Sequence, residues 1–217
     1  MKENVELLTR QQLAARIAAD IPDGSYVNLG IGAPTMVANN LPKGVTITLH
    51  SENGLLGMGP SPAAGEEDAE LINAGKQYVT ELPGASYFHH ADSFAMMRGG
   101  HLDYCILGAY QVSVTGDLAN WHTGSQKDVP AVGGAMDLAI GAKSVFVMMD
   151  LFTKKGECKL VETCSSPLTG IGCVKRVYTE YATFDITETG VVARDIVSGM
   201  DIGELEQMCG IKLKAAS

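Results

Sequence analysis

Short apolar runs alternate with amphipathic stretches along the first two thirds of the chain. Apolar residues recur near helical spacing between residues 5 and 20, and Pro22-Asp23-Gly24 then forms a helix-ending sequence. Apolar and β-branched runs predict buried strands at 26–29, 45–49, 104–107 and 144–149. Further helices are expected over 34–41, from a cap at Asp92 or Ser93 to Gly99, from the turn at 132–134 to Gly141, and over 201–208.

The pattern changes after Asp150. Short apolar runs at 159–161, 177–179, 182–186 and 190–192 favour hairpins, and Thr115-Gly116-Asp117 predicts an earlier hairpin. Before that point, strand, turn, helix and strand follow one another as in a parallel sheet. We therefore expect an α/β fold with an open, mostly parallel, twisted sheet, helices on both faces and an antiparallel C-terminal portion. No linker interrupts the chain, so residues 1–217 are expected to form one domain.

Composition argues against several classes of protein. The 217 residues carry a formal net charge of −9, whereas a nucleic-acid-binding protein needs a basic face. No apolar run approaches the ~20 residues of a membrane-spanning helix. The histidines show no metal-ligand spacing, and the five cysteines form no Cys-x-x-Cys pair. We therefore expect a cytoplasmic protein with reduced thiols that uses no metal ion and binds neither nucleic acid nor membrane.

One carboxylate lies at the end of an expected strand. Glu52 follows the run at 45–49 in a stretch of small residues that includes Gly54, Gly57 and Gly59. Proteins of the α/β class place reactive groups at the carboxyl ends of strands, where glycine lets the backbone approach a ligand. The alternative is structural: Glu52 caps a turn, and Asn53-Gly54 makes a tight bend. Spacing alone favours the turn.

Two glycine-containing segments follow other expected strands. Gly30 and Gly32 do not complete a dinucleotide fingerprint, because Thr35 occupies the third glycine position. This segment is either a helix N-terminus that faces an anion or a plain turn between strand and helix. Gly108 and Ala109 follow the run at 104–107, where they either offer backbone amides to a developing oxyanion or form a bulge.

The stretch S-E-N-G-L-L-G-M-G-P at 51–60 resembles the signature of the β (B) subunit of family I CoA-transferases. The resemblance extends from about residue 14 to about residue 190. Further matching strings are N-L-G-I-G-A-P-T (28–35), R-G-G-H-L-D (98–103), L-G-A-Y-Q-V (107–112), A-N-W (119–121) and G-G-A-M-D-L (133–138).

The resemblance implies a CoA-transferase fold and a role for each matched residue. Glu52 matches the nucleophile that carries a glutamyl-CoA thioester in a ping-pong cycle, and Gly108 and Ala109 match the segment whose amides line the oxyanion site. Coenzyme A is then a substrate, and no cofactor stays permanently bound. Family members have two homologous halves, so the resemblance also implies a separate α (A) subunit, in a heterodimer or an α2β2 assembly, that supplies many contacts to the acyl-CoA.

The strings F-H-H-A-D-S-F (88–94) and W-H-T-G (121–124) look like the branch of the family that acts on 3-oxoadipate and succinyl-CoA. Acetoacetate-handling relatives typically carry an Asp-Ser pair where this chain has His89 and His90. We therefore expect a dicarboxylic acid substrate, with His89 or His90 near its distal carboxylate. The alternative for each histidine alone is a partly exposed loop position without a role in binding, and this alternative is the more favoured one. An acetoacetate- or butyrate-type transferase is the alternative within the family. Other classes also remain open: a ligand-sensing domain without covalent chemistry, and an isomerase or thioester hydrolase with Glu52 as general base.

Overall fold

The computed structural model describes residues 5–122 and 132–216, and five parallel strands form the centre of its main sheet. Most residues of these strands are buried, and the apolar sequences of β5 and β8 predict burial on both faces. In spatial order they are β10 (Val174–Tyr178), β8 (Ser144–Met148), β5 (Tyr104–Leu107), β1 (Tyr26–Leu29) and β2 (Thr48–Ser51).

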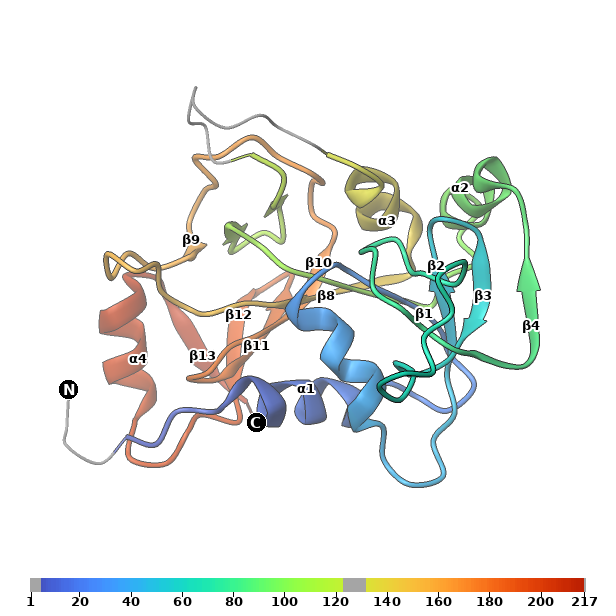
Figure 1. The fold of residues 1–217 in the computed structure, drawn as a ribbon. Coiled ribbons are helices and arrows are strands. Elements are labelled where there is room, and N and C mark those ends of the chain that lie inside the picture. The colour runs from blue at the N-terminus through green and yellow to red at the C-terminus, as the bar shows by residue number, and fades with distance from the viewer. Residues whose placement is uncertain (1–4, 123–131, 217) are drawn as a thin grey trace.

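Antiparallel strands extend this sheet at both ends (Figure 1). Beyond β10 lie β11 (Thr183–Thr187) and β12 (Gly190–Arg194), and β13 (Leu213–Ala215) pairs in parallel with β12 at the edge. Beyond β2 lie β3 (Leu55–Met58) and β4 (Glu81–Tyr87). The α/β class, the parallel centre and the antiparallel C-terminal portion are confirmed.

The prediction missed the antiparallel extension at β3 and β4. No short turn sequence joins these two strands, and Pro83 and Gly84 argue against a strand. The edge position explains why both residues are tolerated there, since an outer strand needs fewer ladder hydrogen bonds.

Helices cover both faces of the sheet (Figure 1). One face packs against α1 (Arg10–Ala19) and a 3-10 helix, η1 (Ala33–Asn40). The other packs against α2 (His90–Arg98), α3 (Ala135–Gly141) and α4 (Ile202–Cys209), and against a small sheet of β7 (Leu118–Ala119), β6 (Gln111–Ser113) and β9 (Leu160–Val161). The hairpin of β6 and β7 is confirmed, but β9 pairs in parallel with β6 instead of forming the expected hairpin.

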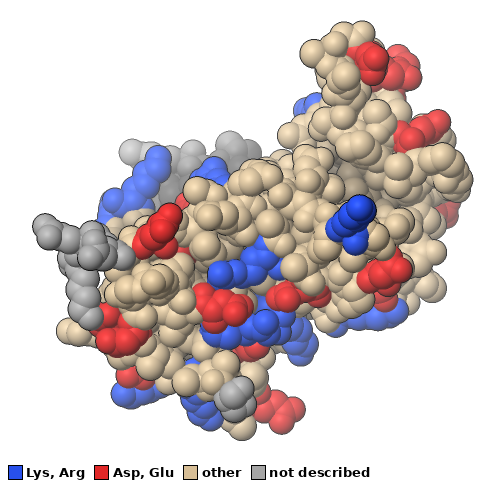
Figure 2. Space-filling model, turned by 90° about the horizontal axis from the view of Figure 1, so that it is seen from below, with Lys and Arg blue, Asp and Glu red and all other residues tan. Residues whose placement is uncertain are grey.

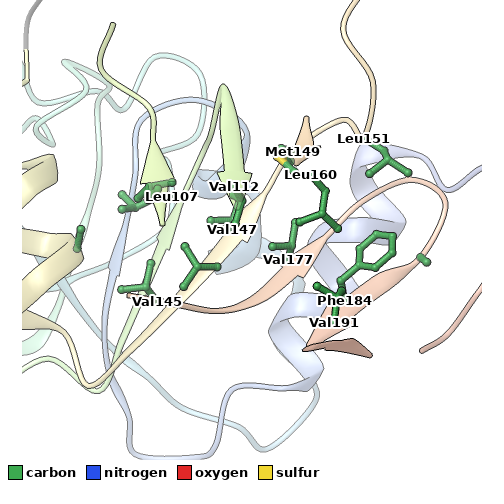
Figure 3. Packing of buried hydrophobic residues seen from close by; sticks show 14 of the residues in the cluster. Leu107, Val112, Val145, Val147, Met149, Leu151, Leu160, Val177, Phe184 and Val191 are labelled. Carbon is green, nitrogen blue, oxygen red and sulfur yellow. The ribbon is translucent and has the colours of Figure 1, made fainter. Parts of the chain in front are cut away.

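Strand β8 separates the two hydrophobic cores. Val145 and Val147 point into the core beneath α3 and the small sheet, together with Val112 and Leu160 (Figure 3). Phe146 and Met148 point into the core beneath α1. This alternation follows from the two-residue period of a strand, and it shows why the run at 144–149 contains no polar residue after Ser144.

A partly buried ion pair connects α1 to the sheet. Asp20, the C-cap residue of α1, accepts hydrogen bonds from Arg176 Nη1 at 2.8 Å and from Tyr178 Oη at 2.7 Å. Arg176 also pairs with Asp185 of β11 and lies over the Phe146 ring. A half-buried guanidinium is stable here because two carboxylates and an aromatic face replace its water.

Several elements differ from the sequence prediction in type or boundary, and α1, for example, begins at Arg10 instead of near residue 5. The helix expected over 34–41 is a 3-10 helix, because Thr35, Val37 and two asparagines are poor helix formers and Asn40 Nδ2 donates back to Met36 O. The strand expected over 45–49 starts three residues later, because Val45 N donates to Pro42 O in a turn. Strand β2 also extends further and ends at Ser51, immediately before Glu52.

The cap of α2 is also different from the expected one. His89 is the N-cap, and its Nδ1 accepts the Ala91 N–H at 3.1 Å. Asp92 lies inside the first turn, and Ser93 is fully buried against the sheet. A histidine ring nitrogen thus accepts the N-cap hydrogen bond, a role that an Asp or Ser side chain usually has.

The charges on the α1 side of the molecule are mixed. Figure 2 shows Lys and Arg interspersed with Asp and Glu on this face, with no large area of one sign. This face therefore lacks the basic stripe that a nucleic-acid-binding surface requires.

Candidate active site

A cavity of about 510 Å³ lies at the carboxyl ends of β1, β2 and β5. Gly30 follows β1, Glu52 follows β2, and Gly108 follows β5, so parallel pairing brings these three positions to one edge of the sheet. All three residues, together with Ala109, line the cavity. Parallel topology therefore assembles four of the sequence-predicted site residues.

Glu52 lies on a tight turn between β2 and β3. Gly54 N donates to Ser51 O at 3.0 Å, and Gly54 has a φ of 115°, which a side chain would strain. Asn53 Nδ2 donates to Ile72 O at 2.8 Å, and Ser51 Oγ accepts the Ala74 N–H at 3.0 Å. The predicted Asn-Gly bend is confirmed, and it is also the element that presents Glu52 to the cavity.

A second glycine turn lies directly against the Glu52 carboxylate. A Cβ atom at Gly134 would overlap Glu52 Oε2, whereas a Cβ atom at Gly108 would meet no atom within 4 Å. Gly134 is the N-cap of α3, and Gly133 and Ala135 line the cavity beside it. The turn before α3 is therefore the backbone that packs on the carboxylate, while Gly108 faces open space.

The environment of Glu52 disfavours its charge. Partial burial raises the pKa of the Glu52 carboxyl, nearby His90 lowers it, and Asp137 of α3 raises it. Asp137 is itself paired with Arg98 of α2. A carboxylate that has lost part of its water is less stabilised as an anion and hence a stronger nucleophile.

A hydrogen bond to the carbonyl oxygen of Gly108 fixes the segment that follows β5. Asn120 Nδ2 donates to Gly108 O at 3.2 Å, and Thr169 Oγ1 donates to Asn120 Oδ1 at 2.6 Å. Because the peptide is trans, the Ala109 N–H points away from Asn120. Within residues 5–122 and 132–216, the N–H groups of Gly108 and Ala109 have no hydrogen-bond acceptor. These amides are therefore available to a ligand.

A buried histidine lies two residues before Glu52. The His50 side chain is 1% exposed, and its ring stacks on Phe88. Its Nδ1 is 3.0 Å from Asn28 Nδ2, and its Nε2 is 2.9 Å from Ser93 Oγ. Burial lowers the pKa of the His50 imidazole to about 4, so the ring is neutral at physiological pH.

Three predicted site residues lie outside the cavity lining. Gly32 is exposed and has a φ of 91°, and its carbonyl accepts the Thr35 N–H, so it serves the turn into η1. His89 caps α2. His90 is exposed and packs edge-on against Phe94, close enough to Glu52 to affect its pKa.

Sequence reasoning missed His50, Asn28 and Gly134. The signal for the first two is a polar residue inside an otherwise apolar strand, which implies a buried partner. A signal for Gly134 is present as well, since Gly133-Gly134 predicts a turn into a helix, but only the fold places that turn beside Glu52.

The structure offers no candidate metal centre within its described residues, where no three His, Cys, Asp or Glu side chains cluster suitably. All five cysteines are free. The helices in the described ranges are too short or too polar to span a bilayer.

The neutral state of His50 predicts a pH-dependent stability. The ring has a pKa of about 4 in the folded protein and about 6.5 when unfolded, so the unfolded state binds more protons between these values. We expect the free energy of unfolding to fall by on the order of 3 kcal/mol from this group as the pH drops from about 7 to about 4. Urea denaturation of the wild type and of His50→Gln, which cannot titrate, measures the difference. Parallel pH profiles for the two proteins would contradict the assignment.

Comparisons with known proteins agree with this geometry. The family described as Coenzyme A transferase matches residues 10–198. The chain is 63% identical over 206 residues to the β (B) subunit of 3-oxoadipate CoA-transferase from Pseudomonas putida, covering 95% of this chain and 96% of that protein. It is 59% identical over 206 residues to the protein of that name from Acinetobacter baylyi, covering 95% of each.

A solved structure shows the same fold at low sequence identity. The apoenzyme of acyl-CoA transferase YdiF from Escherichia coli O157:H7 superposes with a TM-score of 0.72 at 19% identity, over 100% of this chain and 43% of that one. At this identity the likeness concerns the fold alone. The match to the family over most of the chain shows that this protein belongs to the coenzyme A transferase family.

Proposed function

We propose that this chain is the β subunit of a two-chain CoA-transferase that moves CoA from succinyl-CoA to a 3-oxo acid, namely 3-oxoadipate, through a thioester on Glu52. The observation that carries the proposal is the partly buried Glu52 carboxylate, presented to a glycine-lined cavity at the carboxyl ends of parallel strands. The names of the relatives from Pseudomonas putida and Acinetobacter baylyi support the choice of acid and the existence of a separate α subunit.

The first half-reaction transfers CoA to the protein. A Glu52 carboxylate oxygen attacks the thioester carbonyl of succinyl-CoA, the C–S bond breaks, and a mixed anhydride and CoA thiolate result. The thiolate then attacks the glutamyl carbonyl. Its C–O bond to the succinyl group breaks, so succinate leaves and a glutamyl-CoA thioester remains on Glu52.

The second half-reaction repeats these steps in reverse order with the acceptor acid. The acceptor carboxylate attacks the glutamyl thioester, releasing the thiolate and forming a new anhydride. The thiolate attacks the acyl carbonyl of this anhydride, which restores the Glu52 carboxylate and gives the new acyl-CoA. No proton needs to move, so the cavity requires no general acid or base.

Two properties of the cavity serve this chemistry. The unpartnered amides of Gly108 and Ala109 are suited to donate to the oxyanions that form at each carbonyl, where one such donor contributes ~3 kcal/mol. The glycine turn at Gly134 leaves room for the carboxylate but for no side chain beside it. A narrow site of this kind excludes the water that would hydrolyse the anhydride. The α subunit would complete the cavity.

Glu52 is the decisive test of the proposal. In the complex with its α subunit, we expect Glu52→Gln to lower kcat by ~10⁴-fold or more, because the nucleophile is lost. Incubation of the wild type with succinyl-CoA, followed by borohydride or hydroxylamine, should modify the Glu52 peptide in mass spectrometry. A wild-type complex that exchanges CoA without this adduct would contradict the covalent route, and release of free CoA without an acceptor would indicate a hydrolase.

Gly134→Ala tests the contact between the α3 turn and the carboxylate. The added methyl group would overlap Glu52 Oε2, so the carboxylate must move. A displacement of about 1 Å is enough to lower kcat by ~10²-fold. Gly203→Ala in α4 is the matched control, because its methyl group meets only the Asp201 side chain and alanine favours a helix. Equal kcat for both variants, with unchanged circular dichroism, would show that Gly134 does not constrain Glu52.

His90 is the better candidate of the two adjacent histidines for contacting the distal carboxylate of the substrate. It lies near Glu52, whereas the His89 ring already caps α2. We expect His90→Ser to lower kcat/KM for 3-oxoadipate about tenfold relative to acetoacetate, which corresponds to one hydrogen bond to a charged group. The control is His89→Asp, which keeps an N-cap acceptor and should leave the ratio unchanged. An unchanged ratio in His90→Ser would remove His90 from the substrate site.

A further inference from the structure

The His50 side chain has no role in the reaction steps above, although it lies two residues from the nucleophile. A buried polar ring costs folding free energy unless all its polar atoms are paired, so its presence inside β2 requires a reason. The ring lines the 510 Å³ cavity, and it also lines a smaller cavity of about 230 Å³ with Leu56 and Met96. His50 thus forms part of the wall of both cavities.

The hydrogen bonds define which nitrogen of His50 carries the proton. Asn28 Nδ2 is 3.0 Å from His50 O and 3.0 Å from His50 Nδ1. A carbonyl oxygen only accepts, so this atom of Asn28 is the amide nitrogen, and its two hydrogens serve His50 O and Nδ1. Nδ1 therefore carries the lone pair. The proton is on Nε2, which donates to Ser93 Oγ at 2.9 Å.

These bonds tie together three elements that converge on Glu52. Asn28 belongs to β1, His50 to β2 and Ser93 to α2, and Phe88 stacks on the ring from the segment before α2. The Asn28 amide also holds the His50 carbonyl, so both the side chain and the backbone of His50 are fixed. The chain then has only Ser51 before it reaches Glu52.

We propose that His50 is a positioning residue: neutral and protonated on Nε2, it locks the end of β2 to β1 and α2 and thereby aims Glu52 into the cavity. The inference rests on the proposed role of Glu52. His50 transfers no proton, since both ring nitrogens are engaged within the protein. Its contribution is to hold the carboxylate within the fraction of an ångström that attack on a carbonyl demands.

Three variants separate positioning from mere filling of space. His50→Gln offers an acceptor to Asn28 and a donor to Ser93, His50→Leu fills a similar volume without polar atoms, and Ser93→Ala removes the acceptor of the Nε2 proton. The matched control is His101→Gln, because His101 is exposed and lines the smaller cavity but not the larger one.

Each variant is assembled with its α subunit, and the complex is assayed for kcat, KM and the rate of adduct formation on Glu52 with succinyl-CoA. We expect His50→Leu to lower kcat and the adduct rate by up to ~10²-fold with KM changed less than about threefold, since a misplaced nucleophile affects attack more than binding. Ser93→Ala should lie between His50→Leu and the wild type. His50→Gln should recover most of the rate, and His101→Gln should match the wild type.

Two outcomes would overturn the inference. One is that folded His50→Leu forms the Glu52 adduct as fast as the wild type. The other is that His50→Gln forms this adduct no faster than His50→Leu. If His50→Leu does not fold, Ser93→Ala and ¹⁵N-histidine NMR of the wild type decide: the proton must be found on Nε2, and a proton on Nδ1 would refute the network. Absence of any Glu52 adduct in the wild type would instead refute the proposed function, so the two failures are distinguishable.

Discussion

Parallel pairing of β1, β2 and β5 is the constraint on which the site depends. Because Asn28 pairs with His50 and Leu29 pairs with Ile106, the residues that follow these strands are forced to one edge of the sheet. Two of these residues are glycines and the third is Glu52, so the same edge is hollow and carries one carboxylate. The apolar cores on both sides of β8 keep the strands in register.

The site is rigid for reasons that differ from one wall to the next. Glu52 is held by a hairpin turn, Gly108 by the Asn120 amide, and Gly134 by the start of α3. None of these supports is a charged group, which suits a reaction whose intermediates carry their own negative charge. Partial burial and Asp137 raise the pKa of the Glu52 carboxyl, whereas His90 lowers it. The basicity of the carboxylate therefore results from opposing effects.

The sequence predicts the parallel centre of the fold well, because runs such as 104–107 and 144–149 are almost entirely apolar. It does not reveal the pairing of β3 with β4, because a long connection separates these two strands and Pro83 and Gly84 contradict a strand. The start of β2 also differs from the prediction, since hydrogen bonds from Val45 and Thr46 to Pro42 and Asp23 delay the strand. The contact between Thr46 and Asp23 forms only when two segments that are remote in the sequence meet.

The same distinction applies to the site. The resemblance of residues 51–60 to a known signature singles out Glu52, and the glycines after the neighbouring strands are found by the same route. His50 and Gly134 are not found, because their importance lies in what they touch: Asn28 and Ser93 in one case, the Glu52 carboxylate in the other. Local pattern identifies residue types suited to a task, whereas the packing of distant segments decides which of them share a site.

The outer strand β4 has a consequence for the solubility of the molecule. An outermost strand presents a row of free amides and carbonyls, which invites another chain to pair with it. Pro83 has no N–H to donate to an incoming strand, and Gly84, with a φ of 90°, bends β4 away from a regular ladder. These two residues therefore disfavour edge-to-edge pairing between the β4 strands of two molecules.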